Sequence, residues 1–572
     1  MDMKSRIAAL LESSLKAQWP EVQGLPAAED IRGLLEVPPS KEMGDYAFPC
    51  FRLAKALRMA PPKIAAALSE GWQHGTVAEA RAVNGYLNLF LDRGSFARET
   101  VEAVLTADGR YGASDLGKGK TICLDYSSIN IAKRFHIGHL STTMLGHSLK
   151  RIHDWLGYTT VGINHLGDWG TQFGKMICAY KKWGSREEVE KGGVQAMVDL
   201  YVRFHKEAEQ DPALEDEGRA WFKKIEDGDP EAMEIFTWFK DVTLKDTQRV
   251  YDLLGVSFDS YAGESFYNDK MDPVVRSLKE KGLLTESQGA QVVMLDDWGM
   301  NPALILRSDG ATLYITRDLA AAFYRHDTYH FDKCLYVVAY QQELHFRQLF
   351  KILELMGCDW VKGMEHVSFG MVSYEGGSLS TREGHVVYLE DLLNKAIEKA
   401  AQIIEEKSPG LPNKEEVARQ VGVGAVVYFD LHNDRMKDID FRWDAALNFD
   451  GETGPYVQYT HARCCSVLRK AEALQLPEAD YAQLTDDEAQ ALLLLISRFP
   501  DVIREAADRC EPSLITRAVT SVAQAYNKYY YEHRILDDDP AATAARVALT
   551  RAARDVIRTG LYLIGIEAPE RM

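Results

Sequence analysis

The sequence has no pair of cysteines in C-x-x-C spacing, and this absence limits the kinds of site that it can hold. Its eight cysteines are spread along 572 residues, and only Cys464 and Cys465 are adjacent. Disulfide-rich secreted proteins and cysteine-based zinc sites both depend on closely spaced cysteines. We therefore expect no disulfide framework, no cysteine-based zinc site, and a cytoplasmic location, where thiols stay reduced.

Long apolar runs are missing as well. No stretch approaches the ~18 consecutive apolar residues that a membrane-spanning helix requires. The first twenty residues place apolar side chains at helical spacing among charged ones. This pattern predicts a surface helix and not a signal peptide. We expect no membrane partner.

Positive charge is scarce. Lys and Arg number 66 against 85 Asp and Glu, which gives a formal net charge of -19. Nucleic-acid-binding proteins usually carry a basic footprint, so this sum argues against nucleic acid as a partner. The objection is mild, because a large enzyme can carry a local basic face on an acidic body. The length predicts about three or four domains.

The middle of the chain alternates between strand-like and helix-like segments. Predicted strands at 121–127 and 159–167 flank a predicted helix at 136–157, an order typical of a parallel, doubly wound sheet. Charged helices at about 185–300 interrupt the alternation and indicate an insertion. Sheet-like segments resume after it, at ALILRS, TLYIT, CLYVVAY and HVSFGMVS. We assign residues 116–390 to one Rossmann-type α/β domain.

Different patterns flank this domain. Residues 1–115 combine short helices with strands near 79–91 and predict a small α/β domain. Residues 391–452 predict a connecting helical region. Residues 453–572 are helical almost throughout and predict an all-α domain.

A phosphate-binding site is predicted where the first strand of the α/β domain leads into its helix. The helix opens with His136-Ile137-Gly138-His139. A helix N-terminus offers unpaired N–H groups and a positive dipole end to phosphate oxygens. His136 and His139 share a face and can donate further hydrogen bonds, and Gly138 lets a flat adenine approach the backbone. A motif of only four residues is equally well explained by two ordinary surface histidines that bind no ligand.

The wider context of this motif resembles class I aminoacyl-tRNA synthetases. In that family a His-Ile-Gly-His signature follows a strand and opens a helix, as here, and residues 164–176, NHLGDWGTQFGKM, resemble its arginyl branch. The resemblance implies ligation of L-arginine to tRNA(Arg) through an arginyl-adenylate, with AMP and pyrophosphate as products. It implies ATP with Mg²⁺ bound to the ATP and not to the protein, and a monomer as the family default.

The second signature of the family, a mobile loop of KMSKS type, is degenerate in this chain. Its counterpart is GGSLSTREG at 376–384, where Ser378 and Thr381 replace the lysines. A triphosphate that loses pyrophosphate needs positive charge nearby. Lys133 stands where arginyl enzymes place a compensating lysine. The ATP-binding residues implied are Lys133, His136, Gly138, His139, Ser380 and Arg382, of which Lys133, His136 and His139 are the catalytic candidates.

Departures from the family pattern leave one alternative function open. The degenerate loop fits a catalytically inactive paralogue that only binds tRNA or acts in regulation. Ile129 and Ser141 also differ from the usual residues around the first signature, which puts the local geometry in doubt but not the reaction. Intact Lys133, His136 and His139 argue against the inactive paralogue.

An arginine pocket is predicted in DGATLYITRDLAAAFYR, residues 309–325. A flat cation with five donors is best held by a carboxylate and an aromatic face. Tyr314 and Asp318 lie four apart and share a side if a helix has begun by Ile315. Tyr314 could stack on the guanidinium, worth roughly 0.5–2 kcal/mol, and Asp318 could accept two hydrogen bonds. Alone, Asp318 also fits an acid that pairs with a helix dipole.

The resemblance adds further arginine ligands. Gln342, less surely Gln341, would complete the shell around the guanidinium. Asp125 and Asn130, at the end of the first strand, would hold the α-amino group. Two related families fit less well, because a cysteinyl enzyme needs a Cys/His zinc cluster and a glutamyl enzyme needs a basic pocket where this chain offers Asp318.

The regions that would bind tRNA lie at the two ends of the chain. The C-terminal helices resemble the DALR anticodon-binding domain, and single-stranded bases are read by stacking on aromatic side chains. Tyr459, Tyr530 and Met572 are the candidates there, although helix packing explains each tyrosine as well. In GYLNL at 85–89, Tyr86 would stack on a D-loop base and Asn88 would hydrogen-bond it, although a plain edge strand explains the pattern too.

Overall fold

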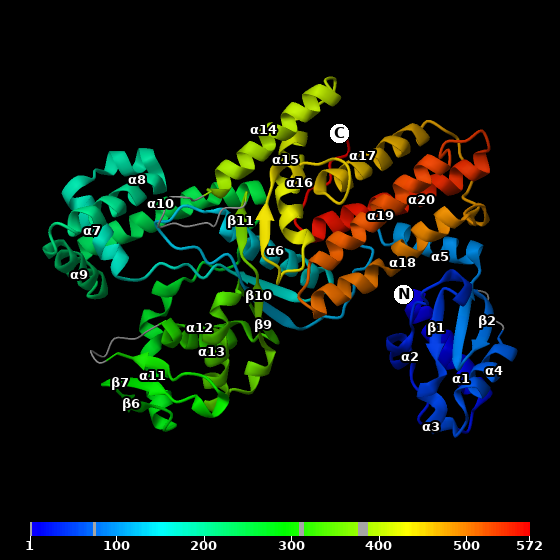
Figure 1. Cartoon of the computed structure of the whole chain (residues 1–572), viewed down its shortest axis with the longest axis horizontal. Coiled ribbons are helices and arrows are strands. Elements are labelled where there is room, and N and C mark those ends of the chain that lie inside the picture. The colour runs from blue at the N-terminus through cyan, green and yellow to red at the C-terminus, as the bar shows by residue number, and fades with distance from the viewer. Residues whose placement is uncertain (1–2, 73–75, 308–313, 376–386) are drawn as a thin grey trace.

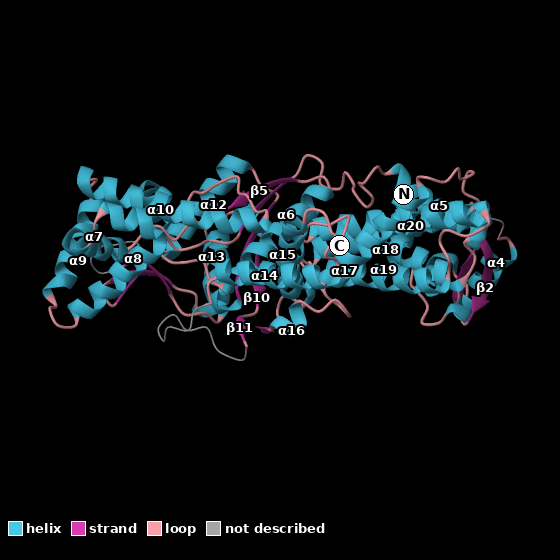
Figure 2. Cartoon of the chain, turned by 90° about the horizontal axis from the view of Figure 1, so that it is seen from above, coloured by secondary structure: helices cyan, strands magenta, loops and turns pink. Residues whose placement is uncertain are grey.

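The computed structural model describes residues 3–72, 76–307, 314–375 and 387–572. The molecule is elongated. A helical insertion lies at one end, a parallel sheet in the middle, and the N-terminal domain at the other end below a helical bundle (Figures 1 and 2). Within the described residues, no helix is long and apolar enough to cross a membrane.

The N-terminal domain packs helices on a three-stranded antiparallel sheet of order β1-β3-β2. The predicted strand region near 79–91 is a hairpin that turns at Asn84-Gly85, where both residues have positive φ, as a tight two-residue turn requires. α4 begins with prolines and Asp92 caps α5 by accepting from the Ser95 N–H. The elements are α1 (Met3–Gln18), α2 (Ala28–Leu34), β1 (Tyr46–Pro49), α3 (Ala54–Leu57), α4 (Pro61–Glu70), β2 (Val77–Val83), β3 (Tyr86–Leu91) and α5 (Arg93–Thr106).

The central sheet has four parallel strands in the order β10-β9-β4-β5. The two central strands of this sheet, β9 and β4, are nearly continuous apolar runs, since helices cover the sheet. The chain passes from β4 to β5 on one side and later returns on the other side as β9. The carboxyl ends of β4 and β9 therefore form a switch point, where such sheets bind ligands. The elements are β4 (Thr121–Asp125), α6 (Leu140–Trp155), β5 (Thr159–Ile163), α12 (Tyr314–Tyr329), β9 (Lys333–Ala339), α13 (Glu343–Leu355) and β10 (Met364–Phe369).

The insertion is helical at first and then turns into a small antiparallel sheet of order β6-β7-β8. The expectation of helices up to about residue 300 was wrong for this sheet. The helices and strands between β5 and α12 are α7 (Thr171–Trp183), α8 (Arg186–Ala208), α9 (Ala213–Glu226), α10 (Pro230–Leu254), α11 (Met271–Glu280), β6 (Thr285–Ser287), β7 (Ala290–Val293) and β8 (Ala303–Leu306).

The segment TLYIT was also expected to be sheet-like, and this was wrong for its described part. Tyr314, Ile315 and Thr316 form the first turn of α12. The segment forms a helix and not a strand because a run of good helix formers follows it. In addition, Ile315 and Leu319, at i, i+4 spacing, are both buried on one face of the helix.

The rest of the chain is almost entirely helical. Glycines allow close packing between its helices: a Cβ at Gly454 would lie 2.8 Å from the carbonyl oxygen of Gly424. Side-chain caps on Thr453, Asp486 and Asp539 begin three of the helices. The elements are β11 (Val372–Tyr374), α14 (Leu389–Lys407), α15 (Lys414–His432), β12 (Ile439–Phe441), α16 (Trp443–Ala446), α17 (Gly454–Ala471), α18 (Asp487–Asp508), α19 (Ser513–Glu532) and α20 (Pro540–Leu563).

The fold class predicted from the sequence is confirmed: a parallel-sheet α/β domain with an insertion lies between a small α/β domain and an all-α domain.

Candidate functional site

The two histidines of the 136–139 motif are held by main-chain hydrogen bonds at the start of a helix. The Gly138 N–H donates to Nδ1 of His136 at 3.1 Å, and the His136 N–H donates to Nδ1 of His139 at 3.2 Å. The ring centroids lie 3.8 Å apart. Since Nδ1 accepts in both rings, a neutral imidazole carries its proton on Nε2. Each histidine therefore has an Nε2–H that can donate to a ligand.

Both histidines are neutral at pH 7. Burial, helped by the nearby charge of Lys133, lowers the pKa of His136. Burial and then the neighbouring His136 lower the pKa of His139 to about 3. Lys133 itself is exposed in the loop before the motif. The site thus combines two neutral donors with one full positive charge, which suits a polyanion such as a triphosphate.

Gly138 has a second role that the sequence did not indicate. A Cβ at this position would lie 3.0 Å from Cε1 and Nδ1 of the His136 ring. The absence of a side chain thus makes room for the His136 ring that caps the turn.

Three consecutive hydroxyl side chains, in residues 141–143, anchor the first turn of α6. Ser141 donates to Oδ1 of Asp430 on α15 at 2.5 Å, and Thr142 donates to the carbonyl oxygen of Val337 on β9 at 2.7 Å. Thr143 donates to the carbonyl oxygen of His139 at 2.7 Å. The helix start is therefore tied to the sheet and to the C-terminal helices at once.

The segment that follows the predicted second signature is bonded to the motif. The Ile137 N–H donates to the carbonyl oxygen of Val387 at 3.0 Å, and His136 forms an antiparallel bridge with Tyr388. The guanidinium of Arg134 lies 3.6 Å from the Tyr388 ring centroid. The signature loop at 376–384, with Ser378, Ser380, Thr381 and Arg382, lies outside the described residues.

Two histidines approach the carboxylate of Asp318. Its Oδ2 is 2.7 Å from Nε2 of His345, and its Oδ1 is 3.9 Å from Nε2 of His165. Burial acts to raise its pKa, but the hydrogen bond and charge of His345, then His165 and Arg325, hold the pKa below its usual value. Asp318 is therefore ionised at neutral pH, and its side chain is 28% exposed. A carboxylate of this kind can receive a cation.

On the same helix as Asp318, Arg325 forms a buried ion pair with Asp125 at the end of β4. Arg325 Nη2 lies 2.8 Å from Oδ2 of Asp125, and the two side chains are 1% and 8% exposed. Ser128 donates to the other oxygen of Asp125 at 2.8 Å. Burial disfavours the charge of Arg325, but Asp125 raises its pKa well above the usual value. The pair fixes α12, and with it Asp318, against the central strand.

Three of these residues, His165, His345 and Arg325, were not predicted from the sequence. A weak signal existed for Arg325, which follows Asp318 by seven residues and so lies on the same face of the helix. No sequence signal distinguished His165 or His345 from other histidines near the motif segments.

The remaining predicted arginine ligands lie at the surface in this structure. Tyr314 is 65% exposed at the first residue of α12, and Gln342 is exposed at the end of a short 3-10 helix, Tyr340–Gln342. Asn130 is exposed and bridges to Gly167, where a Cβ would lie 2.2 Å from its Oδ1. Asn130 is thereby placed beside the 164–176 segment.

A second candidate site is a cavity of about 540 Å³ among the C-terminal helices, and it brings together Tyr459, Tyr530 and Met572. The guanidinium of Arg463 lies 4.9 and 5.2 Å from the ring centroids of Tyr459 and Tyr530. The described residues that line the cavity include four basic side chains and no acidic one: Arg463, Arg469, Lys470 and Arg571. Arg463 was not predicted from the sequence, although it follows Tyr459 by four residues and shares its helix face.

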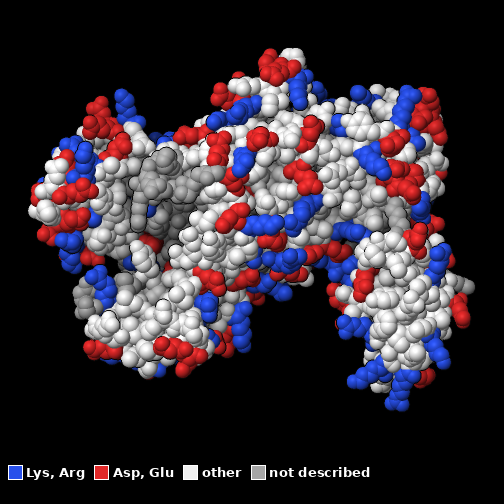
Figure 3. Space-filling view, in the orientation of Figure 1, with Lys and Arg blue, Asp and Glu red and all other residues white. Residues whose placement is uncertain are grey.

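This cavity shows how an acidic protein can carry a basic surface. Acidic and basic side chains are intermixed over the face shown in Figure 3, and basic ones gather where the sheet meets the C-terminal helices. The net charge of -19 is therefore a sum over the whole molecule and not a property of each surface.

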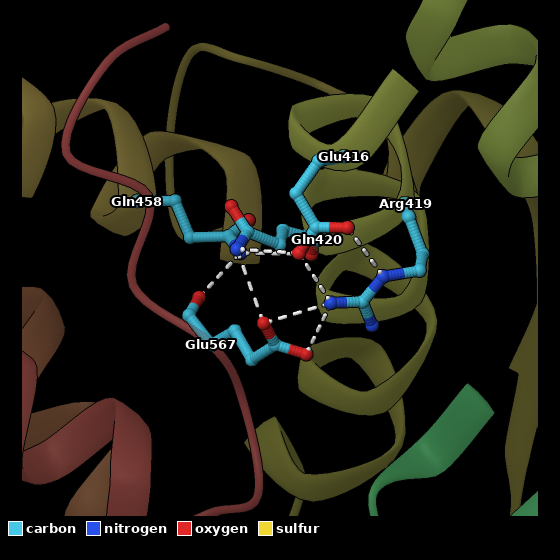
Figure 4. A network of polar contacts seen from close by, with 5 residues as sticks. All are labelled: Glu416, Arg419, Gln420, Gln458 and Glu567. Atoms are coloured by element: carbon cyan, nitrogen blue, oxygen red, sulfur yellow. Dashed lines mark hydrogen bonds and ion pairs between the residues drawn. The ribbon is translucent and has the colours of Figure 1, made fainter. Parts of the chain in front are cut away.

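The chain after α20 forms a strap across α15 and α17 (Figure 4), and its last two residues, Arg571 and Met572, line the cavity. Arg419 donates to both carboxylate oxygens of Glu567 at 2.7 and 2.8 Å. Gln458 donates to the main-chain oxygens of Glu567 and Gln420, each at 2.9 Å. These bonds hold the strap, and Met572 at its end packs on a small apolar cluster.

Tyr86 and Asn88, the predicted D-loop contacts in the N-terminal domain, do not lie on an edge strand. β3 is the central strand of its sheet and not an edge. Tyr86 is partly exposed and packs edge-on against Phe51, with 5.4 Å between ring centroids. Asn88 is 5% exposed, so its side chain contributes little surface.

Comparison with known families accounts for nearly the whole chain. The model described as "tRNA synthetases class I (R), catalytic domain" matches residues 100–443. The "Arginyl tRNA synthetase N terminal domain" matches residues 3–91, and the "DALR anticodon binding domain" matches residues 457–572.

Full-length relatives are similar in sequence and in structure. The chain is 51% identical to an arginine–tRNA ligase of Alkaliphilus metalliredigens over 572 residues, which cover 100% of both chains. It is 53% identical to that of Clostridioides difficile over 545 residues, 95% of this chain and 96% of the relative. The solved arginyl-tRNA synthetase of Thermus thermophilus superposes with a TM-score of 0.82 at 26% identity, covering 98% of this chain and 99% of that one.

Proposed function

The chain belongs to the arginyl-tRNA synthetase family of class I aminoacyl-tRNA synthetases, and we propose that the two sites described above divide its reaction between activation and tRNA recognition. The enzyme ligates arginine to its tRNA for protein synthesis, using ATP. We assign residues to ATP binding and activation, to arginine recognition and to tRNA recognition.

For activation, we assign ATP to the start of α6. The supporting observation is the pair of neutral histidines whose Nε2–H groups remain available beside the positive charge of Lys133. The arginine carboxylate attacks the α-phosphate and pyrophosphate leaves, so negative charge shifts onto the leaving oxygens. His136, His139 and Lys133 stabilise that charge, with Ser380, Arg382 and the backbone at Gly138 completing the ATP site.

Mg²⁺ enters this site with ATP in our assignment, and the protein holds no metal ion of its own for the reaction. Within the described residues, the group whose ligand atoms lie close enough to hold a metal is Asp486, Glu488 and His533. Those residues belong to the start of α18 and the end of α19 and not to the α6 motif.

For arginine recognition, we assign the guanidinium to Asp318, with Tyr314 and Gln342 closing around it. Asp318 supports this because two histidines orient an ionised carboxylate at the switch point of the sheet. Asp125 and Asn130 hold the α-amino group. The buried Arg325 neutralises part of the Asp125 charge, so Asp125 also has a structural part in the pocket.

For tRNA, we assign the anticodon to the cavity lined by Tyr459, Tyr530 and Met572, because aromatic faces and unopposed basic side chains suit single-stranded bases. Tyr86 and Asn88 contact the D-loop. We further propose a cytoplasmic monomer divided at residues 1–115, 116–390 with an insertion at about 185–300, 391–452 and 453–572.

The test of this function is direct. Purified protein supplied with L-arginine, ATP, Mg²⁺ and tRNA(Arg) should form arginyl-tRNA with release of AMP and pyrophosphate, measured by incorporation of labelled arginine. Lysine, as a second cationic amino acid, serves as the matched control and should not be incorporated. Folded protein that binds tRNA without charging it would support the inactive paralogue instead.

The anticodon assignment predicts a separate effect. Tyr530→Ala, or removal of Arg571 and Met572, should raise the KM for tRNA roughly tenfold, because stacking on an aromatic side chain is worth about 1–3 kcal/mol per base. The KM for arginine should stay within twofold, since the arginine pocket lies on other elements. Tyr562→Ala, an exposed tyrosine on α20, is the control. An unchanged KM for tRNA in both variants would mean that these residues only pack the helices.

A further inference from the structure

One buried carboxyl group, that of Asp430 on α15, is not explained by the assignments above. It is 8% exposed and lies 289 residues along the chain from its partner Ser141, which is 6% exposed. Ser141 donates to one carboxylate oxygen at 2.5 Å. The other oxygen is buried and has no hydrogen-bond partner among the described residues. Burial raises the pKa of Asp430 to about 7, although the bond from Ser141 acts in the opposite direction.

An arrangement of this kind costs stability. A buried polar atom without a partner loses its hydration and gains nothing in return. An apolar side chain of similar size at position 430 would avoid this cost. The hydrogen bond between Ser141 and Asp430 is therefore not explained by a gain in stability. Its position in the fold indicates another role.

Ser141 lies two residues after His139, in the first turn of α6. On the opposite side, α15 is firmly held around Asp430. Tyr428 hydrogen-bonds Thr520 of α19, and the carbonyl oxygen of Leu431 accepts from Thr516 at 2.9 Å. Farther along α15, the network of Figure 4 fixes the helix to the C-terminal strap. Asp430 is thus a fixed point against which the start of α6 is held.

We propose that Asp430 is a positioning residue for arginine activation, which acts through Ser141 to set the orientation of the first turn of α6 and hence of His136 and His139. The proposal rests on the catalytic role assigned to those two histidines. Asp430 is buried and reaches the motif through its hydrogen bond with Ser141. The other two hydroxyls of the turn bond to β9 and to the turn itself, so among these three hydroxyls that of Ser141 joins the motif to the C-terminal helices.

The test is a double-mutant cycle on the full-length protein, with the kcat of arginyl-tRNA formation measured at saturating arginine, ATP and tRNA. Ser141→Ala and Asp430→Leu should each lower kcat about tenfold, because a small misplacement of catalytic donors is costly. The double variant should be no slower than either single one, since both remove the same bond. The KM for arginine should stay within twofold. Asp430→Asn keeps an oxygen that can accept from Ser141 and should retain kcat within threefold.

Thermal stability distinguishes positioning from general support of the fold. The folded-state pKa of Asp430 is raised, so its ionised form is disfavoured in the folded protein, and the resulting loss of stability grows as pH rises toward 7 and is complete above it. Asp430→Asn should therefore raise Tm relative to the parent more at pH 8 than at pH 5. Asp430→Leu should have a Tm at pH 8 equal to or above that of the parent while its kcat falls.

Ser148→Ala is the matched control. Ser148 is a buried hydroxyl on the same helix that donates to the carbonyl oxygen of Leu563 at 2.9 Å, away from the motif. It should lower Tm and leave kcat intact. Three results would overturn the positioning role: additive losses of kcat in the cycle, an unchanged kcat in Asp430→Leu, or a fall in kcat in Ser148→Ala as well.

His139→Ala distinguishes this proposal from the catalytic assignment of the motif. If His139→Ala retains kcat, the catalytic assignment fails, and the positioning role fails with it. If only Asp430→Leu retains kcat, the positioning role alone is wrong.

Discussion

Lys133→Ala should lower the kcat of arginine activation by about 10²–10³, the usual cost of removing one charge-stabilising donor from a transition state. The reason lies in the charge state of the site. Burial keeps His136 and His139 neutral at pH 7, so they donate hydrogen bonds without a full charge. Lys133 is the cation near enough to lower the pKa of both. The KM for arginine should change little, because we assign Lys133 to the phosphates of ATP and not to arginine.

Rapid-quench measurement of adenylate formation would report this rate directly. Lys118→Ala, which removes another exposed loop lysine of the same domain, is the control and should be neutral. Thr381→Lys on the Lys133→Ala background should restore part of the rate, because it returns a lysine to the degenerate loop. A rate for Lys133→Ala within a few fold of the parent would transfer the role to Arg382.

Asp318→Asn should reduce kcat/KM for arginine by about 30- to 400-fold, with the KM for ATP nearly unchanged. The substitution keeps the size of the side chain and removes the negative charge that we assign to the guanidinium. Loss of one partner of a desolvated ion pair costs roughly 2–5 kcal/mol. The side chain is 28% exposed, so the lower half of that range applies.

The matched control for Asp318 is Asp327→Asn on the same helix. Asp327 is exposed and pairs with His326 at 3.1 Å, away from the switch point of the sheet. Steady-state kinetics with arginine varied at fixed ATP should show an effect for position 318 alone. Equal kinetics in both variants would place the guanidinium site elsewhere.

Local patterns predicted much of the fold. The order of strand, loop and helix around the 136–139 motif appears as β4, a 3-10 turn and α6, because periodicity and helix-start signals are properties of a short segment. The same reasoning failed for TLYIT and for the small sheet at β6–β8. Short apolar runs fit either a strand or a helix, and the choice depends on what they pack against.

Single residues with a chemical signature were identifiable, but their partners were not. Asp318 follows from the need of a guanidinium for a carboxylate, whereas the orientation of that carboxylate depends on His345 and His165, which reach it from other elements. Arg463 joins Tyr459 and Tyr530 only because α17 and α19 pack side by side. Such contacts have no local signal in the sequence.

The sequence by itself determined the family, the fold class and the residue types of both candidate sites. These depend on motifs and periodicities within short segments, which do not change with the way the segments pack together. Tertiary structure decided the electrostatics. Burial makes both motif histidines neutral, pairs Arg325 with Asp125, and places Asp430 against Ser141 across 289 residues of chain. The physical reason is that the free energy of a charge or hydrogen bond depends on the solvent and partners around it, and only folding brings those together.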